Sequence, residues 1–523
     1  MKKYIYLLSF AALGFTACEK DYLETTPEYA EATATIVGST AAAELSINGI
    51  CKAMTTQYLG VQGMNGEGTI NVWYGDVTGN DMQRSNQTGW AALWNSTYHL
   101  QKSSVYLYYP WFYYYKLIGN ANGIICNIDN ATGTEADRAY LKAQALVFRA
   151  YSFFRLAEHY AHRWSDEQGN CPGIVLRIDQ STGDHPLATL AETYKRIYDD
   201  LDEAIKLFQA SGRDRDSKEF YKPNLNVAYA VYARAALTRE DWANAAKYAA
   251  LARQGYPLMS VANYKAGFNA QNSEWIWGVY EASDQTLYYY SMFAYLASNA
   301  SSSMQRTYPL AISKELIDQI PETDVRRDLF LVPKTEGEFT DGFLANGNPR
   351  ASAATNTGTD APASLRTRAF AENGSRLYST SQVYPYMHFK FLCEFTPGGG
   401  PFVLFRTGEM YYIEAEANCH LNKNAEAQQL LYEVTSKFDP SYTKSTKTGD
   451  ELLKEVKLYR RFDLWGEGHN WFDYKRWKEP IVRKQYPVGS FHKTFAVTIN
   501  PTDGNDWTWA IPERESDYNA DVK

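Results

Sequence analysis

Glu158, His159 and His162 are the residues whose types and spacing come nearest to a metal site. Glu158 and His162 are four positions apart, and His159 and His162 are three apart, so an α-helix would bring them to one face. A metal site needs further ligands, however, and the HExxH order of catalytic zinc helices is absent. Histidine at the end of a helix also interacts favourably with the helix dipole. We therefore expect no metal at this position.

A second cluster, near the C-terminus, has the residue types of acid–base chemistry. Its members are Arg460, Arg461, Asp463, Glu467, Asp473 and Arg476. Buried charges require partners, so we interpret the cluster as an ion-pair network that ties the last helices to the scaffold. The sequence contains no GxSxG nucleophile elbow, and Gly398–Pro401 lacks the Lys-Ser/Thr of a phosphate-binding loop and is interpreted as a turn. We expect no catalytic residues.

Aromatic residues make up 15% of the chain, with 41 Tyr and 13 Trp. Tyr and Trp combine a rigid apolar face with a polar tip, which suits binding surfaces. Two stretches concentrate them: the glycine-rich segment Val61–Asn86, which we interpret as a loop, and the run Tyr106–Tyr115. The run is too dense to belong entirely to a site, so we expect alternate members to pack in the core or against a partner protein.

The chain has 523 residues, a net charge of −8 and a pI of about 5.6. Nucleic acid is therefore not an expected partner, because phosphate binding needs a basic face. Six Cys are present without a CxxC pair, so neither zinc nor thioredoxin-like chemistry is indicated. No motif requires a cofactor. Nothing in the sequence signals calcium, although calcium binding is possible.

The N-terminus has the pattern of an export signal. Two Lys precede a short apolar segment, Tyr4–Thr16, which is too short to span a bilayer. The segment ends in Gly14–Cys18, where small residues before a Cys resemble a bacterial lipobox. We expect residues 1–17 to be a lipoprotein signal peptide, Cys18 to carry the lipid, and residues 18–44 to form a tether. The alternative is an ordinary signal peptide with a chance Cys.

The longest helical pattern is Asp137–Trp164. Apolar residues recur there at spacings of three and four, which predicts an α-helix of about seven turns. Ala143, Ala150 and Ala157 repeat every seven positions, so this face favours the close approach of another helix rather than a cofactor. The rest of the chain must supply the neighbouring helices.

Three further segments provide those neighbours. Leu190–Phe208 has the same spacing, and Asn224–Pro257 follows the tetratricopeptide pattern of two small-residue helices, about 34 residues long. Gly408–Pro440 resembles another such pair. One pair cannot bury its own apolar face, so several must stack.

These patterns predict a mainly α fold. We expect a tetratricopeptide-like scaffold of helical pairs, an α-α superhelix, with a loop-rich, partly irregular half and a few short strands. A single body should cover residues 45–523, with the repeat helices mainly in 137–257 and 406–477 and the loop-rich binding elements mainly in 61–115 and 258–405. Further predicted elements are helices over Leu45–Leu59 and Glu451–Trp465, strands over Glu274–Glu281 and Trp507–Pro512, and a long surface loop over Lys334–Ser381.

Six short motifs follow one another along the chain. They are Cys18–Leu23, Arg149–Leu156, Tyr198–Leu201 with Ala204, Arg406–Tyr411 with Ala415–Ala417, Arg460–Leu464 with Glu467, Gly468, Trp471, Asp473 and Arg476, and Ile511–Glu515 with Asn519. In this order they resemble the SusD/RagB family of outer-membrane glycan-binding lipoproteins. Two positions depart from the family pattern, Tyr459 in place of Glu and Asn470 in place of Arg, and we expect both to be structural.

The resemblance implies a function and a partner. Family members bind oligosaccharides or polysaccharides and sit as a lid on a SusC-like TonB-dependent outer-membrane transporter, so we expect a binding protein and not an enzyme. A lipid such as palmitate at Cys18 would hold the chain at the outer membrane, and the acidic run Glu19–Asp21 resembles the signal for the outer cell surface.

Two alternatives remain. One is a repeat scaffold or lid that binds no glycan and serves a transporter for peptides or other nutrients. The remote alternative is a glycoside hydrolase, which needs two carboxylates about 5–9.5 Å apart across a cleft.

Sugar rings present apolar C–H faces and hydroxyl edges, so a site needs aromatic platforms and charged or amide groups. The family builds such sites from loops away from the repeats, and the spacing of Asp76 and Arg84 is similar to a polar pair of its starch-binding members. The expected glycan-binding residues are Trp73, Tyr74, Asp76, Arg84, Trp90, Trp94, Asn95, Tyr288, Tyr289, Tyr290 and Phe293. Alanine at Trp90, Trp94 or Arg84 should then weaken glycan binding without lowering the melting temperature. The alternative is that these aromatic residues belong to the core.

Overall fold

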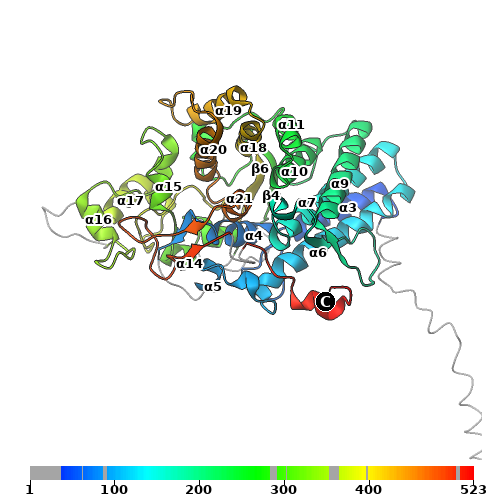
Figure 1. Ribbon diagram of the computed structural model, residues 1–523, viewed down its shortest axis with the longest axis horizontal. Helices are drawn as coiled ribbons and strands as arrows, with labels where there is room; N and C mark the ends of the chain where they lie inside the picture. Colours follow the sequence, from blue (N-terminus) through cyan, green and yellow to red (C-terminus); the bar gives the residue numbers. More distant parts are fainter. Residues whose placement is uncertain are drawn as a thin grey trace, which may run out of the picture.

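The structure is a computed structural model, shown in Figure 1, and it describes residues 37–61, 63–85, 91–282, 291–301, 303–352, 364–395, 398–501 and 507–522. The expected signal peptide, the lipid attachment at Cys18 and most of the tether lie outside these residues, as do Trp90 and Tyr288–Tyr290. Among the described residues, no helix combines the length and the apolar character needed to cross a bilayer.

The long helix that the sequence predicted is α7 (Glu135–Tyr160). The Thr134 side chain accepts a hydrogen bond of 3.1 Å from the backbone N–H of Asp137 and so caps its first turn. The three Ala of the seven-residue repeat are all buried. α7 packs against α9 (Leu190–Ser211), one of its expected neighbours, and against α6 (Val105–Ile125), which the sequence did not indicate as a neighbour.

Further helical pairs stack beside α9. α10 (Leu225–Thr238) and α11 (Trp242–Ala252) form one pair, and α18 (Thr407–His420) and α19 (Asn424–Ser436) form the next, with α11 packed against α18. α20 (Gly449–Asp463) packs against both α18 and α19. Figure 1 shows this array from α9 through α11 to α20 along one edge of the molecule. The mainly α, tetratricopeptide-like fold is confirmed.

The other half of the molecule is more regular than the sequence predicted. The glycine-rich segment expected to be a loop contains α4 (Gly66–Ile70), the π-helix η2 (Asn71–Val77) and the strand β1 (Met82–Arg84). Its glycines allow close packing, since a Cβ added at Gly75 would lie 2.3 Å from the carbonyl oxygen of Gly468. The loop prediction for this segment was therefore wrong.

Short antiparallel strand pairs accompany the helices in both parts of the molecule. β4 (Trp275–Tyr280), which the sequence predicted, pairs with β6 (Pro401–Arg406). The other pairs are β1 with β5 (Leu310–Ile312), β2 (Pro172–Val175) with β3 (Leu187–Thr189), and β7 (Ile481–Val482) with β8 (Thr498–Ile499). The strand predicted over Trp507–Pro512 is wrong, because these residues form a turn and irregular backbone.

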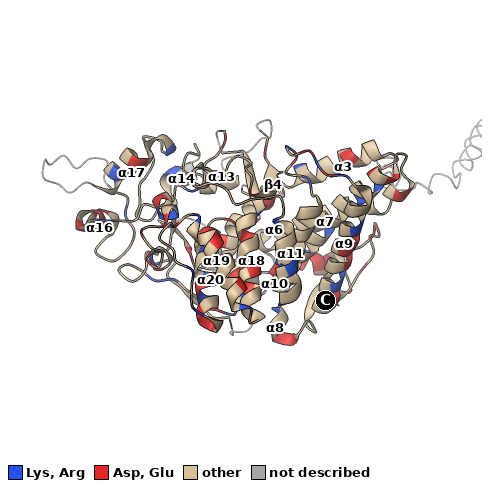
Figure 2. Cartoon of the chain, turned by 90° about the horizontal axis from the view of Figure 1, so that it is seen from above, with Lys and Arg blue, Asp and Glu red and all other residues tan. Residues whose placement is uncertain are grey.

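The remaining helices flank these elements. They are α3 (Thr40–Ala53), α5 (Ala91–Trp94), α8 (Trp164–Glu167), α12 (Val261–Tyr264), α13 (Met292–Leu296), α14 (Ser303–Thr307), α15 (Lys314–Ile317), α16 (Glu336–Gly342), α17 (Leu365–Asn373), α21 (Asn470–Trp477) and α22 (Glu513–Tyr518), with the 3-10 turns η3 (Tyr98–Leu100), η4 (Ile128–Asn130), η5 (Val325–Leu329) and η6 (Gly374–Arg376). The long loop predicted over Lys334–Ser381 thus contains α16 and α17. Acidic and basic residues are interspersed on outer helices such as α9 and α17 (Figure 2).

A buried charge network joins the repeat helices to the other half. Arg406, the last residue of β6, forms ion pairs with Glu274, Asp463 and Glu467 at 2.8, 3.0 and 2.6 Å. Lys390 pairs with Glu467 at 2.7 Å and also donates to the carbonyl oxygen of Asp463 at 2.7 Å. These charges are taken out of water together, so each depends on its partners.

Candidate functional site

Trp73 and Tyr74, the first two expected glycan ligands, lie on η2 and are both buried. The Trp73 ring meets the Tyr295 ring edge-on at a centroid distance of 5.0 Å. The Tyr74 hydroxyl donates a hydrogen bond of 3.0 Å to the carbonyl oxygen of Tyr106. In this arrangement neither ring presents a face to a ligand.

Asp76 and Arg84, the expected polar pair, have separate partners. Asp76 is buried, and its carboxylate accepts a hydrogen bond of 2.6 Å from the backbone N–H of Gly468. Burial raises the pKa of Asp76 to about 8, although the hydrogen bond from Gly468 acts in the opposite direction. The guanidinium of Arg84 lies 5.1 Å from the centroid of the Trp94 ring, a cation–π contact inside the protein.

Trp94 and Phe293 are also buried, while Asn95 is half-buried. The burial of Trp94 and Arg84 favours the alternative that these residues belong to the core. Replacing either of them is then expected to lower the melting temperature, contrary to the sequence-based expectation. Trp90 and Tyr288–Tyr290, which the sequence also predicted as ligands, lie outside the described residues.

The buried aromatic stack continues outward to the surface. Tyr106, on the first turn of α6, contacts Trp73 at a centroid distance of 6.2 Å. It also stacks on Tyr98 of η3 at 4.6 Å, with 32° between the ring planes. Tyr98 and Tyr106 are both half-buried, so the stack reaches solvent at this point.

A second group of half-buried rings lies on and beside α6. Phe112 lies 5.8 Å from Tyr108 on the same helix and 5.8 Å from Tyr58. Tyr108 and Phe112 are four positions apart, so they share one face of the helix. We call these five residues the aromatic row: Tyr58, Tyr98, Tyr106, Tyr108 and Phe112. Its two groups, Tyr98 with Tyr106 and Tyr58 with Tyr108 and Phe112, each offer ring faces, and the tyrosines add hydroxyl groups, which is the chemistry that suits a sugar.

The run Tyr106–Tyr115 divides between this surface and the core. Its inward members are buried: Tyr109, Trp111, Tyr113 and Tyr114. The expectation that only part of the run packs inside is therefore met. Tyr58 and Tyr98 were missed by sequence reasoning because each is a single aromatic residue outside the dense clusters, whereas the spacing of Tyr108 and Phe112 was a usable signal.

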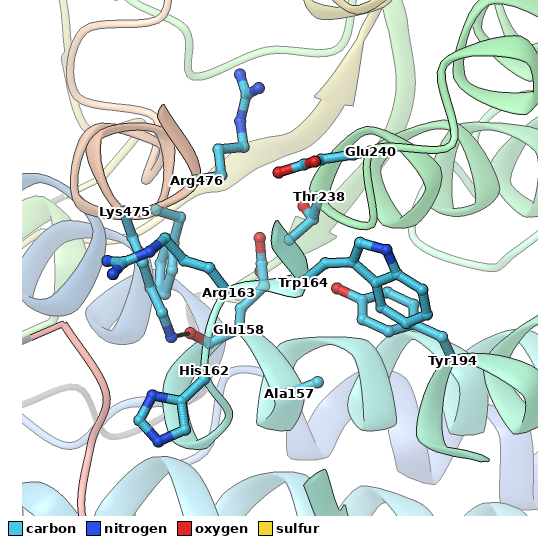
Figure 3. A pocket seen from close by; sticks show the side chains of 11 residues that line it. Ala157, Glu158, His162, Arg163, Trp164, Tyr194, Thr238, Glu240, Lys475 and Arg476 are labelled. Atoms are coloured by element: carbon cyan, nitrogen blue, oxygen red, sulfur yellow. Dashed lines mark hydrogen bonds between the residues drawn. The ribbon is translucent and has the colours of Figure 1, made fainter. Parts of the chain in front are cut away.

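Two of the residues first considered as metal ligands, Glu158 and His162, line a pocket between α7 and α21 (Figure 3). Glu158 is engaged by Arg155 at 2.7 Å, and His162 lies half-buried at the edge of the pocket. The cavity of about 20 Å³ has room for about one water molecule. His159 is fully buried, and its Nδ1 lies 2.7 Å from the carbonyl oxygen of Arg155.

Lys475 has a structural role in the same pocket. Its ammonium group donates to the carbonyl oxygens of Glu158 and Ala161, at 2.7 and 2.6 Å, and so caps the C-terminus of α7. Burial lowers the pKa of Lys475 to about 7. Within the described part of the chain, no group of three or more His, Cys, Asp or Glu side chains is arranged to hold a metal ion.

The C-terminal charged cluster forms the ion-pair network that the sequence predicted. Asp473 pairs with Arg460 at 2.7 Å and with Arg476 at 2.8 Å, and Arg476 pairs with Glu416 of α18 at 2.5 Å. Asn470, one of the two departures from the family pattern, accepts hydrogen bonds from the backbone N–H groups of Asn80 and Asp81. These opposite charges neutralise one another, so the cluster has a structural role and holds α18, α20 and α21 together.

Two larger cavities lie elsewhere on the molecule. One, of about 740 Å³, lies in the repeat array between α11, α18 and α19 and is lined largely by small and polar side chains. The other, of about 760 Å³, lies among η5, α17 and η6 and is lined by several basic side chains. Each is large enough for a ligand, unlike the pocket of Figure 3.

Two family models match the chain in succession. The model described as "Starch-binding associating with outer membrane" matches residues 21–237, and the SusD family model matches residues 242–522. The second match covers more than half of the chain, so this protein belongs to the SusD family. No protein with curated annotation matches the chain.

Solved structures share the fold over nearly the whole length. A SusD-like carbohydrate binding protein from Bacteroides vulgatus is 23% identical, with 93% of this chain and 97% of that chain covered and a TM-score of 0.73. A SusD superfamily protein from Bacteroides thetaiotaomicron is 20% identical, with 93% and 99% covered and a TM-score of 0.70. One from Bacteroides fragilis is 17% identical, with 93% and 100% covered and a TM-score of 0.67. At these identities the likeness establishes the fold alone.

Proposed function

We propose that this protein is a cell-surface lipoprotein that binds an oligosaccharide or polysaccharide and delivers it to a SusC-like TonB-dependent transporter, without catalysis. Membership of the SusD family carries the proposal, and the family model over residues 21–237 is described as starch-binding. The SusD-like relative from Bacteroides vulgatus is named a carbohydrate binding protein, which supports the same ligand class.

The aromatic row is the glycan platform in this proposal. Its half-buried rings present apolar faces for the C–H faces of sugar rings, and its hydroxyl groups supply hydrogen-bonding groups for the edges. Trp73 supports the row from beneath, since it packs on Tyr106. Trp90 and Tyr288–Tyr290 are retained as proposed ligands from the sequence. An open platform buries little of its ligand, so we expect dissociation constants from roughly micromolar to millimolar.

Calorimetry with a panel of purified glycans tests this platform. Tyr98→Ala and Tyr106→Ala should each weaken binding of the cognate glycan by about tenfold, or ~1.4 kcal/mol. Tyr229→Ala is the matched control, because Tyr229 is also half-buried and stacks on Tyr248, but in the repeat array. Equal affinity in wild type and in both row variants would remove the row from the site.

Attachment and transport are tested in cells. Cys18→Ala should release the protein from the membrane fraction, because acyl chains supply the anchoring free energy. Retention of this variant at the membrane would argue against a lipid anchor at Cys18. A pull-down with the wild-type protein as bait, in which the repeat array is intact, should capture the transporter. Capture would support the proposed partner.

The two alternatives give different outcomes in the same experiments. A scaffold or lid that serves a transporter for peptides would bind no glycan of the panel yet still co-purify with the transporter, and the cavity of about 740 Å³ between α11, α18 and α19 would then be its docking surface. A glycoside hydrolase would release new reducing ends from a polysaccharide, which we do not expect.

A further inference from the structure

The cavity of about 760 Å³ lies among η5, α17 and η6. In Figures 1 and 2, α17 lies at the end of the molecule away from α6. This volume falls within the roughly 300–1,000 Å³ of small-ligand sites. Five basic and three acidic side chains line it. The cavity therefore has a surplus of positive charge on a chain whose net charge is −8.

Two of the five basic side chains are neutralised within the wall. Arg368 pairs with Glu338 at 2.7 Å and with Glu372 at 3.3 Å. Lys265 pairs with Asp328 at 2.7 Å. These pairs account for two of the three acidic side chains that line the cavity, and Glu322 is the third.

The guanidinium groups of Arg327 and Arg376 are held in place without being neutralised. Arg327 donates to the carbonyl oxygens of Ile317 and Ile320, the latter at 2.6 Å. Arg376 donates to two backbone carbonyl oxygens at 2.7 and 2.6 Å. Carbonyl oxygens fix the orientation of a guanidinium, but they leave its positive charge uncompensated.

Lys334 adds a third charge of the same kind. It is exposed at the rim of the cavity, just before α16. Among the residues that the structure describes, no carboxylate lies at ion-pair distance from Arg327, Arg376 or Lys334. The cavity thus holds three cationic groups from three different segments, two of them with fixed orientation.

An apolar wall faces these charges. Phe330, Val332 and Pro333 line the cavity, and Phe330 and Pro333 are buried. A separate small core lies beneath this region, formed by Leu331, Leu365, Ala369, Val383, Met387 and Phe389. The combination of an apolar wall with fixed cations suits a ligand that has an apolar face and an anionic group.

We propose that this cavity is a subsite for an acidic sugar residue. Arg327, Arg376 and Lys334 bind its carboxylate or sulfate group, and its C–H face lies against the apolar wall. Arginine suits this role because its planar fork of N–H groups matches the two oxygens of a carboxylate. The inference rests on the proposed function and narrows its ligand to an anionic polysaccharide.

Calorimetry on the full chain with an oligogalacturonide tests the subsite. The matched ligand is the neutral oligosaccharide obtained by reducing the carboxyl groups, and it should bind at least about tenfold more weakly, with the affinity difference shrinking as salt is raised. Lys334→Glu should weaken binding of the oligogalacturonide about tenfold while leaving the melting temperature unchanged, because Lys334 is exposed. Lys206→Glu, an exposed site on α9, makes the same change in net charge and should have no effect.

Further arms separate the outcomes. A further ligand is an oligosaccharide that carries sulfate esters but no carboxyl groups. If it binds in place of the oligogalacturonide, with the same loss of affinity in Lys334→Glu, the anionic group is a sulfate ester. Equal binding of the acidic and reduced ligands, or unchanged affinity in Lys334→Glu, would overturn the subsite. If neutral glycans bind and lose affinity in Tyr98→Ala while Lys334→Glu has no effect, the proposed function stands and only the subsite falls. If no saccharide binds, both fall.

Discussion

Arg461 of α20 forms a bidentate ion pair with Asp81, at 2.6 and 2.8 Å, although the two residues are 380 positions apart in the sequence. Asp81 is fully buried and also accepts a hydrogen bond of 2.5 Å from the Asn470 side chain. The indole N–H of Trp465 donates to the carbonyl oxygen of Asp81 at 3.0 Å. Three residues near the C-terminus, Arg461, Trp465 and Asn470, therefore hold in place the segment that the sequence predicted as a binding loop.

Asp81→Ala should destabilise the protein strongly. It leaves the Arg461 charge, which is mostly buried, without its partner, and breaking such a pair costs about 3–5 kcal/mol. Asp199→Ala is the control, because Asp199 pairs with Lys195 at 2.7 Å on the exposed face of α9 and should contribute less than about 1 kcal/mol. Denaturant unfolding of both variants measures the difference. A similarly small loss of unfolding free energy in both variants would show that the ion pair between Arg461 and Asp81 does not stabilise the fold.

Gly75→Ala should also be destabilising. The added Cβ would lie 2.3 Å from the carbonyl oxygen of Gly468, and backbone must move to relieve that contact, at a cost of about 1–3 kcal/mol or more. Gly119→Ala on α6 is the matched change, because nothing lies within 4 Å of its Cβ position. It should stabilise the protein by about 0.5–1 kcal/mol through helix propensity. The two melting temperatures should therefore move in opposite directions.

The sequence predicted the repeat array because its signal is local. The three- and four-residue spacing that places Ala143, Ala150 and Ala157 on one face is fully contained in one helix, and the same holds for α10, α11, α18 and α19. The strand β4 was also predicted, since a short apolar run between polar residues is a local pattern. The charged C-terminal cluster was interpreted correctly as a network, but its partners Asp81 and Glu416 could not be read from spacing.

The candidate site was harder to predict, because core and platform use the same residue types. Trp73 looked like a ligand in a glycine-rich stretch, yet Gly75 in that stretch permits close packing against Gly468. Burial depends on contacts such as that between Arg461 and Asp81, which join distant parts of the chain. Tyr98, by contrast, reaches the surface although nothing in its local sequence distinguishes it.

Trp94→Ala tests this distinction directly. Trp94 is buried against Arg84 at 5.1 Å and Phe495 at 5.5 Å, so its removal should leave a cavity and cost about 3–5 kcal/mol. Trp242→Ala should cost less, because Trp242 is half-buried and stacks on His420 at 3.9 Å near the surface of the repeat array. Thermal unfolding measures both. A melting temperature of Trp94→Ala equal to that of wild type would restore Trp94 as a surface ligand.

Glu416 should make the stability of the repeat array depend on acid pH. Burial raises the pKa of Glu416, but the charges of Arg476 and Arg460 and hydrogen bonds from Arg476 and Trp477 outweigh burial and lower the pKa from 4.5 to about 2. Between these values the unfolded chain binds more protons than the folded one. The stability contributed by Glu416 is therefore complete above pH 4.5 and is lost as the pH falls toward 2.

Urea unfolding of Glu416→Gln at several pH values checks this dependence. Wild type should exceed the variant in free energy of unfolding by about 3 kcal/mol at pH 6, and the difference should shrink to below about 1 kcal/mol near pH 2.5. Glu426→Gln, which removes an exposed carboxylate from α19, should track wild type at every pH. A constant difference between wild type and Glu416→Gln from pH 6 to pH 2.5 would mean that Glu416 titrates at the same pH in the folded and unfolded chains, and the ion pair with Arg476 would then not set its pKa.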